Sequence, residues 1–154
     1  LVRSRGLGDV YKRQELFNAT QAQAQESIEP HYNYDGYTAY QSGFILDKNF
    51  KESLKYDNFT INGYQISKNP TGDNRINLYD QTLYGVSENK ANGVFFSLDG
   101  KSINKNTLIQ NYGQPNSYSP TSAWGEEYMY KIGNKDVRFY IYNGYVIKCQ
   151  IISE

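Results

Sequence analysis

Tyrosine dominates the aromatic content of this chain: 16 of its 154 residues are tyrosine, while the mean hydropathy is only −0.75. A core assembled from such a chain must bury rings whose hydroxyl groups need hydrogen-bond partners. Aromatic and β-branched residues also favour strands. Because the formal net charge is zero, self-repulsion does not favour disorder. We therefore expect a polar, aromatic and strand-rich domain with a single core.

The strongest strand pattern lies near the C-terminus, where hydrophobic residues alternate in three consecutive segments. These segments span residues 124–132, 136–142 and 145–152. Alternation places one set of side chains on one face: Tyr128, Tyr130 and Ile132, then Val137, Phe139 and Ile141, then Tyr145, Ile147, Cys149 and Ile151. The last two segments are joined by Asn143-Gly144, which is typical of a two-residue type I′ hairpin turn. The pattern predicts a three-stranded antiparallel meander.

A short helix is predicted before this meander, at about residues 104–112. Asn104 is a favourable N-cap, and Ile103 and Leu108 have the spacing of a hydrophobic staple. Gly113 suits the left-handed position after the helix, and a proline two residues later prevents continuation. The predicted fold class is therefore α+β: an antiparallel sheet that ends in the meander and is packed by the short helix, with a polar N-terminal helix or stalk.

Upstream, Val94, Phe96 and Leu98 alternate on one face, which predicts a strand at 93–98 before an Asp99-Gly100 turn. Further patterns predict a short helix within 47–56 and a hairpin at 59–67 around Asn62-Gly63. Residues 77–87 fit either a strand or a helix. Residues 31–42, with four tyrosines, keep no single period and are expected to be irregular.

The domain organisation is predicted from a change in composition. Residues 1–14 contain four of the 16 basic residues and resemble translated sequencing-adaptor read-through, so we expect a non-native leader there. The remainder holds 12 basic and 15 acidic residues, a net charge of about −3. We expect a polar helix or linker at 15–42 and a single α+β domain at 43–154.

The predicted helix and meander resemble a motif of small exported bacterial domains. The residues that carry the resemblance are the run from Asn104 to Pro115, then Tyr128, Tyr130, Phe139, Tyr140 and the closing run 145–148. Similar motifs occur in BamE (SmpA/OmlA)-like envelope lipoproteins, β-lactamase-inhibitor-like modules and uncharacterised lipoproteins of Firmicutes. The resemblance covers about residues 93–152. It implies a scaffold for binding or assembly at the cell envelope rather than an active site.

Familiar catalytic and metal-binding patterns are missing from the sequence. The only histidine, His31, is expected to be a solvated loop residue, and the only cysteine, Cys149, a buried hydrophobe. Glu126 and Glu127 are neighbours on a predicted strand, so their side chains should point to opposite faces. We expect no catalytic residues, no metal and no cofactor. The slightly acidic remainder argues against nucleic-acid binding, and no apolar run is long enough to span a membrane.

The surplus of tyrosine is the remaining functional signal. Tyrosine provides a large contact area at low entropic cost, so an exposed aromatic surface at Tyr118, Tyr140 and Tyr142 is the candidate binding site. The alternative is that these rings only cover the sheet. We expect a non-enzymatic module outside the cytoplasm of a Gram-positive bacterium, in the cell envelope or secreted, binding a protein or a cell-wall glycan. The alternative function is a hydrolase or lyase that acts on cell-wall glycan with carboxylates and tyrosines brought together by folding.

Overall fold

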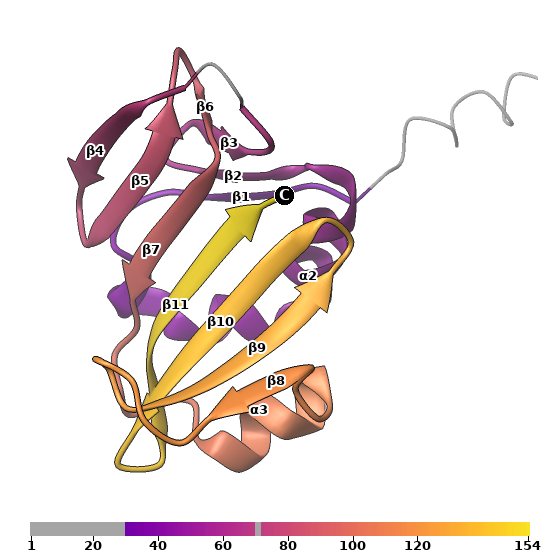
Figure 1. Ribbon diagram of the computed structural model, residues 1–154, viewed down its shortest axis with the longest axis vertical. Coiled ribbons are helices and arrows are strands. Elements are labelled where there is room, and N and C mark those ends of the chain that lie inside the picture. The colour runs from indigo at the N-terminus through magenta and orange to yellow at the C-terminus, as the bar shows by residue number, and fades with distance from the viewer. Residues whose placement is uncertain (1–29, 70–71) are drawn as a thin grey trace, which may run out of the picture.

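The computed structural model describes residues 30–69 and 72–154, which form an α+β fold with two sheets (Figure 1). The larger sheet has seven strands in the order β4-β5-β7-β11-β10-β9-β8, and every neighbouring pair is antiparallel. Its strands are β4 (Asn74–Leu78), β5 (Gln81–Val86), β7 (Gly93–Ser97), β8 (Ser117–Ser119), β9 (Glu126–Ile132), β10 (Lys135–Tyr142) and β11 (Tyr145–Ser153).

The smaller sheet crosses the upper end of the larger one in Figure 1. Its order is β1-β2-β3-β6, formed by β1 (Tyr32–Tyr34), β2 (Phe59–Ile61), β3 (Tyr64–Ile66) and β6 (Lys90–Ala91). β2 and β3 form the antiparallel hairpin predicted from the sequence, whereas β1 and β6 each pair in parallel. Hydrophobic residues of both sheets belong to one buried cluster.

The helical segments cover one face of the large sheet, which we call the inner face. They are η1 (Thr38–Leu46), α2 (Lys48–Ser53), η2 (Leu54–Tyr56) and α3 (Lys105–Tyr112). Phe44 of η1 contacts Phe96 of β7, and Tyr112 of α3 contacts Phe139 of β10. Figure 1 shows the helices behind the large sheet, so no described helix covers its opposite, outer face.

The capped helix is confirmed. Asn104 accepts a hydrogen bond from the backbone N–H of Thr107 at 2.8 Å, which satisfies one donor that the first turn leaves free. Ile103 and Leu108 are both buried, as a hydrophobic staple requires. Gly113 ends the helix with φ +80°. Local side-chain chemistry was therefore sufficient to predict α3.

The meander is also confirmed, with one correction to the last strand. Ile141 pairs with Val146 but Tyr140 pairs with Lys148, so Ile147 is an extra residue in a β-bulge. Because a one-residue insertion reverses the alternation, Val146 is buried whereas Tyr145 is exposed. Cys149 and Ile151, beyond the bulge, lie in the core as expected.

The N-terminal part of the described chain differs from the expectation. The segment 31–42, expected to be irregular and part of a linker, contributes β1 and the start of η1 to the fold. Thr38 and Ser42 are buried, and β1 pairs with β2. These contacts involve residues distant in sequence, so no local pattern signals them. The ambiguous stretch 77–87 forms most of the β4–β5 hairpin. The leader at 1–14 and the stalk expected from 15 to 29 lie outside the described residues.

Candidate binding surfaces

The three tyrosines proposed from the sequence do not form one surface. Tyr118 of β8 pairs with Tyr128, whose ring faces the core, and the two rings meet at 5.3 Å. Tyr140 and Tyr142 alternate with the buried Phe139 and Ile141 and therefore lie on the outer face. Tyr142 is 59% exposed and Tyr118 52%, whereas Tyr140 is only 7% exposed. Tyr118 is thus separated from the other two by the sheet itself.

The outer face carries a different group of side chains, three aromatic and one basic, which we call the outer cluster: Phe95, Trp124, Tyr140 and Lys148. The Phe95 ring centroid lies 5.6 Å from that of Trp124 and 6.1 Å from that of Tyr140. Lys148 Nζ is 5.4 Å from the centre of the Phe95 ring and 5.1 Å from the centre of Trp124. These distances are within cation–π range, so the ammonium group orients both rings.

Backbone geometry fixes the position of Trp124 at the start of β9. The Trp124 N–H donates to Ser122 Oγ at 3.1 Å, and Ser122 Oγ–H donates to the Gly125 carbonyl at 2.7 Å. Gly125 has φ +101°, and a Cβ there would clash with the carbonyl oxygen of Ile141. Only glycine allows this close approach to β10. Trp124 is therefore presented by a tight turn and remains 43% exposed.

Charged side chains lie next to the outer cluster. Arg138 Nε is 3.3 Å from Glu127 Oε2, and Glu127 is the cross-strand neighbour of Tyr140. Burial raises the pKa of Tyr140 to about 12, and the Glu127 carboxylate acts in the same direction. The Tyr140 ring thus stays neutral and supports Phe95 from below the exposed surface, while Trp124 remains accessible.

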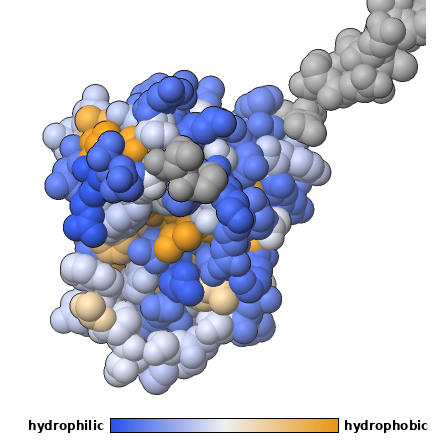
Figure 2. All heavy atoms as spheres, turned by 45° about the horizontal axis from the view of Figure 1, so that its top comes forward, coloured by the Kyte–Doolittle hydropathy of each residue, from blue (hydrophilic) through white to orange (hydrophobic). Residues whose placement is uncertain are grey.

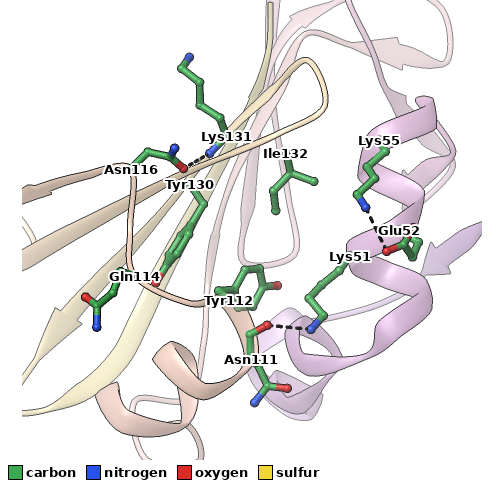
Figure 3. Close-up of a pocket in the computed structure, with 10 residues that line it drawn as sticks. All are labelled: Lys51, Glu52, Lys55, Asn111, Tyr112, Gln114, Asn116, Tyr130, Lys131 and Ile132. Carbon is green, nitrogen blue, oxygen red and sulfur yellow. Dashed lines mark hydrogen bonds and ion pairs between the residues drawn. The ribbon is translucent and has the colours of Figure 1, made fainter.

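A groove of about 300 Å³ opens on the inner side, between α2 and the segment from α3 to β9 (Figure 3). Lys51 Nζ donates to the Asn111 carbonyl at 3.0 Å and lies 5.2 Å from the centre of the Tyr112 ring. Lys55 forms an ion pair with Glu52 at 3.2 Å. The Lys131 side chain points away from the groove. Lys51 therefore connects α2 to α3, whereas the Lys55–Glu52 pair is local to the consecutive segments α2 and η2.

The residues considered for catalysis are separated in space. Glu126 accepts hydrogen bonds from Lys105 Nζ at 3.1 Å and from the Tyr118 hydroxyl at 3.2 Å, whereas Glu127 pairs with Arg138. The two carboxylates lie on opposite sides of the sheet, as predicted. His31 is exposed. Cys149 is fully buried, and burial raises the pKa of its thiol well above the ordinary value.

Within 30–69 and 72–154, no group of three or more His, Cys, Asp or Glu side chains is arranged to hold a metal ion. No helix in the same ranges has the length and apolar character needed to cross a membrane.

Sequence reasoning missed Trp124 and Phe95. Phe95 belongs to a strand whose alternation was recognised for Val94, Phe96 and Leu98, so the opposite face was predictable from the same pattern. Trp124 precedes its strand and follows no alternation. Only the pairing of β7 with β11 brings Phe95 close to Lys148.

Together these features define an α+β domain that is built mainly of antiparallel strands and presents aromatic side chains on an open sheet face. The chain belongs to the family described as Immunodominant staphylococcal antigen B, which matches residues 31–151. This family replaces the BamE-like and β-lactamase-inhibitor-like groups suggested by the sequence motif.

The chain is also similar to individual proteins over part of its length. Immunodominant staphylococcal antigen B from Staphylococcus aureus strain USA300 is 47% identical over 68 residues, or 44% of this chain, and the protein from strain COL matches equally. The matched segment spans 38% of the length of these relatives. Among solved structures, a DUF4309 family protein from Bacillus subtilis is similar with a TM-score of 0.49 and 14% identity, covering 74% of this chain and 99% of that one.

Proposed function

We propose that this protein is a non-enzymatic binding module, exported to the cell envelope or secreted, and that its outer cluster binds the glycan of the bacterial cell wall. The observation that carries the proposal is Trp124, which is 43% exposed yet held in place by Lys148, Phe95 and a glycine-dependent turn. A ring fixed before binding loses little conformational freedom when a ligand stacks on it. The relatives are named as a staphylococcal antigen, which supports exposure outside the cell.

The surroundings of the outer cluster favour a glycan over a protein. Protein interfaces have an apolar core rimmed by polar residues, whereas the outer cluster has the charged neighbours Glu127 and Arg138. The surface shown in Figure 2 is mostly hydrophilic, with apolar patches of limited extent. A sugar ring offers C–H groups to the negative face of an aromatic ring and hydroxyls to polar neighbours. Lys148 and Ser97, joined at 3.0 Å beside Phe95, supply such polar groups.

Retention on purified staphylococcal peptidoglycan, stripped of teichoic acids, tests the proposal. The wild-type chain should sediment with the insoluble glycan, and Trp124→Ala should reduce the bound fraction about fivefold, as loss of one stacking ring predicts. Tyr56→Ala is the matched control, because Tyr56 is also exposed (47%) but lies on η2.

Two outcomes would contradict the proposal. Equal retention of the wild type and the Trp124 variant would remove the outer cluster as the site. Retention that collapses between low and moderate salt would indicate binding to a polyanion rather than to stacked sugar rings.

A further inference from the structure

Three exposed tyrosines form a second aromatic group, which shares no residue with the outer cluster. This tyrosine triad consists of Tyr37, Tyr40 and Tyr79, whose exposed fractions are 42%, 80% and 53%. The rings of Tyr37 and Tyr40 stack at 4.9 Å, and the edge contact of Tyr37 with Tyr79 is at 5.0 Å. The group joins η1 to the β4–β5 turn, so residues about forty positions apart form one continuous aromatic surface.

The backbone at Tyr79 is unfavourable for a side chain. Leu78 pairs with Gln81, so Tyr79 and Asp80 form a two-residue hairpin turn. Tyr79 has φ +56°, in the left-handed region where glycine is preferred. A tyrosine therefore occupies a position at which its side chain strains the turn. Strain of this kind persists where a side chain serves a purpose other than stability.

The Asp80 carboxylate fixes the triad from beneath. It accepts hydrogen bonds from the backbone N–H of Thr38 at 3.0 Å and of Ala39 at 2.9 Å, and from the Thr38 hydroxyl at 3.0 Å. Gln81 Nε2 also donates to it, at 2.8 Å. These bonds hold the first turn of η1, which follows Tyr37, against the turn that carries Tyr79. The rings are therefore arranged before any ligand binds.

The triad consists of three side chains that carry no formal charge. The charge of Asp80 is taken up by the four donors beneath the rings. The cation–π contacts found among the described residues involve Tyr84, Phe95, Tyr112 and Trp124, and none of the triad. What remains accessible are ring faces and phenolic hydroxyls. This combination suits an uncharged ligand with both apolar C–H faces and hydroxyl groups.

We infer that the tyrosine triad is a second carbohydrate-binding platform, specific for neutral sugar units. The inference shares the ligand class of the proposed function but needs none of the residues of the outer cluster. The two sites are close: the Ser97 N–H donates to the Asp80 carbonyl at 3.3 Å, and Ser97 pairs with Lys148 across the next strand. With strands about 4.8 Å apart, Asp80 lies roughly 10 Å from Lys148.

The test titrates the full chain with chitotetraose, a soluble neutral oligomer of N-acetylglucosamine, and measures affinity by calorimetry and stability by thermal unfolding. Tyr79→Gly removes a ring and relieves the positive φ, so it should weaken binding about fivefold while the melting temperature stays level or rises. Tyr40→Ala, at the most exposed ring, should weaken binding to a similar degree. Tyr56→Ala should change neither quantity.

The outcomes separate the two proposals. If the wild type binds peptidoglycan but not chitotetraose, or if only Trp124→Ala weakens binding of the oligomer, the triad inference is overturned and the proposed function stands. If the wild type binds neither, both are overturned. A Tyr79→Gly variant with a lower melting temperature would show that the ring is a packing element, which also overturns the inference.

Discussion

The two faces of the large sheet use the same residue types differently. On the inner face, Tyr112, Tyr130 and Phe139 contact one another, and the hydroxyls of Tyr112 and Tyr130 donate to the backbone carbonyls of Ile45 and Gly113. On the outer face, the rings of the outer cluster lie beside ammonium, guanidinium and carboxylate groups.

The difference shows what decides whether an aromatic residue is structural. A tyrosine on the inner face is stabilised because its ring is buried and its hydroxyl meets a fixed carbonyl, so neither part is left without a partner. Burial raises the pKa of Tyr130 to about 12, as it does for Tyr140 on the outer face. Trp124 has neither full burial nor a described hydrogen bond of its own side chain, and is available to a ligand.

The largest loss of stability is expected from a substitution at the centre of the inner face. Phe139→Ala should lower the free energy of unfolding by about 3 to 5 kcal/mol, since Phe139 is fully buried between Tyr112 and Tyr130. Urea denaturation measures the loss. Phe95→Ala, a half-buried outer ring, is the matched comparison and should cost less. Equal losses for the two variants would contradict the distinction between the faces.

Parts of the fold that depend on neighbouring residues were predictable from the sequence. The cap of α3 and the Asn-Gly turns rest on side chains within a few positions of each other. The bulge at Ile147, the parallel pairing of β1 with β2 and the burial of Thr38 depend on distant partners, and no local pattern encodes them.

The candidate site was less predictable than the fold. Composition correctly indicated a surplus of exposed tyrosine. It could not show on which face of the sheet the side chains of β8 lie, because β8 is an edge strand of only three residues. Tyr118 was therefore grouped with Tyr140 although the sheet separates them. Tyr79 was missed because a positive φ in a two-residue turn is signalled in sequence by glycine or asparagine, not by tyrosine.

A substitution in the β10–β11 turn should have the next largest effect on stability, because this turn sets the pairing register of β10 and β11 and so decides which side chains lie on each face. Asn143 and Gly144 have φ values of +52° and +81°, as the predicted type I′ turn requires. Gly144→Val should cost about 1 to 2 kcal/mol, measured as a lower melting temperature. Because a Cβ at Gly144 meets nothing within 4 Å, the whole loss of stability is conformational.

Asparagine tolerates a positive φ, so Gly144→Asn is the control and should lower the melting temperature less than Gly144→Val. An unchanged melting temperature for the valine variant would contradict the turn assignment.

A smaller effect is expected from charge on the outer face. Burial alone would raise the pKa of Asp136, but hydrogen bonds with Glu154 and Lys131 outweigh it and lower this pKa below its usual value. A lowered pKa in the folded state stabilises the protein above the unfolded pKa, near 4, and this contribution disappears as pH falls through the folded value. Asp136→Asn should therefore reduce stability by about 1 kcal/mol at pH 7, because the ion pair with Lys131 is half exposed.

The pH profile of this variant provides the check. Denaturation midpoints measured from pH 7 down to pH 2 should converge for the wild type and Asp136→Asn at the acidic end. Lys131→Met removes the partner and should flatten the profile in the same range. A constant gap between the wild type and the asparagine variant at all pH values would show that packing, and not charge, is responsible.

The smallest effect on stability is expected at Trp124, and this expectation is the sharpest test of the comparison between the faces. The Trp124 ring is 43% exposed and contacts the Phe95 ring and the Lys148 ammonium group, so Trp124→Ala should lower the free energy of unfolding by only about 0.5 to 1 kcal/mol. Truncation of a fully buried tryptophan to alanine would lower the free energy of unfolding by about 3 to 5 kcal/mol.

Because Trp124 is the only tryptophan in the chain, its fluorescence emission reports on the outer cluster alone. Its emission should shift when the glycan is added to the wild type, and Trp124→Phe should keep most of the binding because a ring remains. A destabilisation as large as that of Phe139→Ala would instead place Trp124 with the structural rings and remove the physical distinction between the two faces.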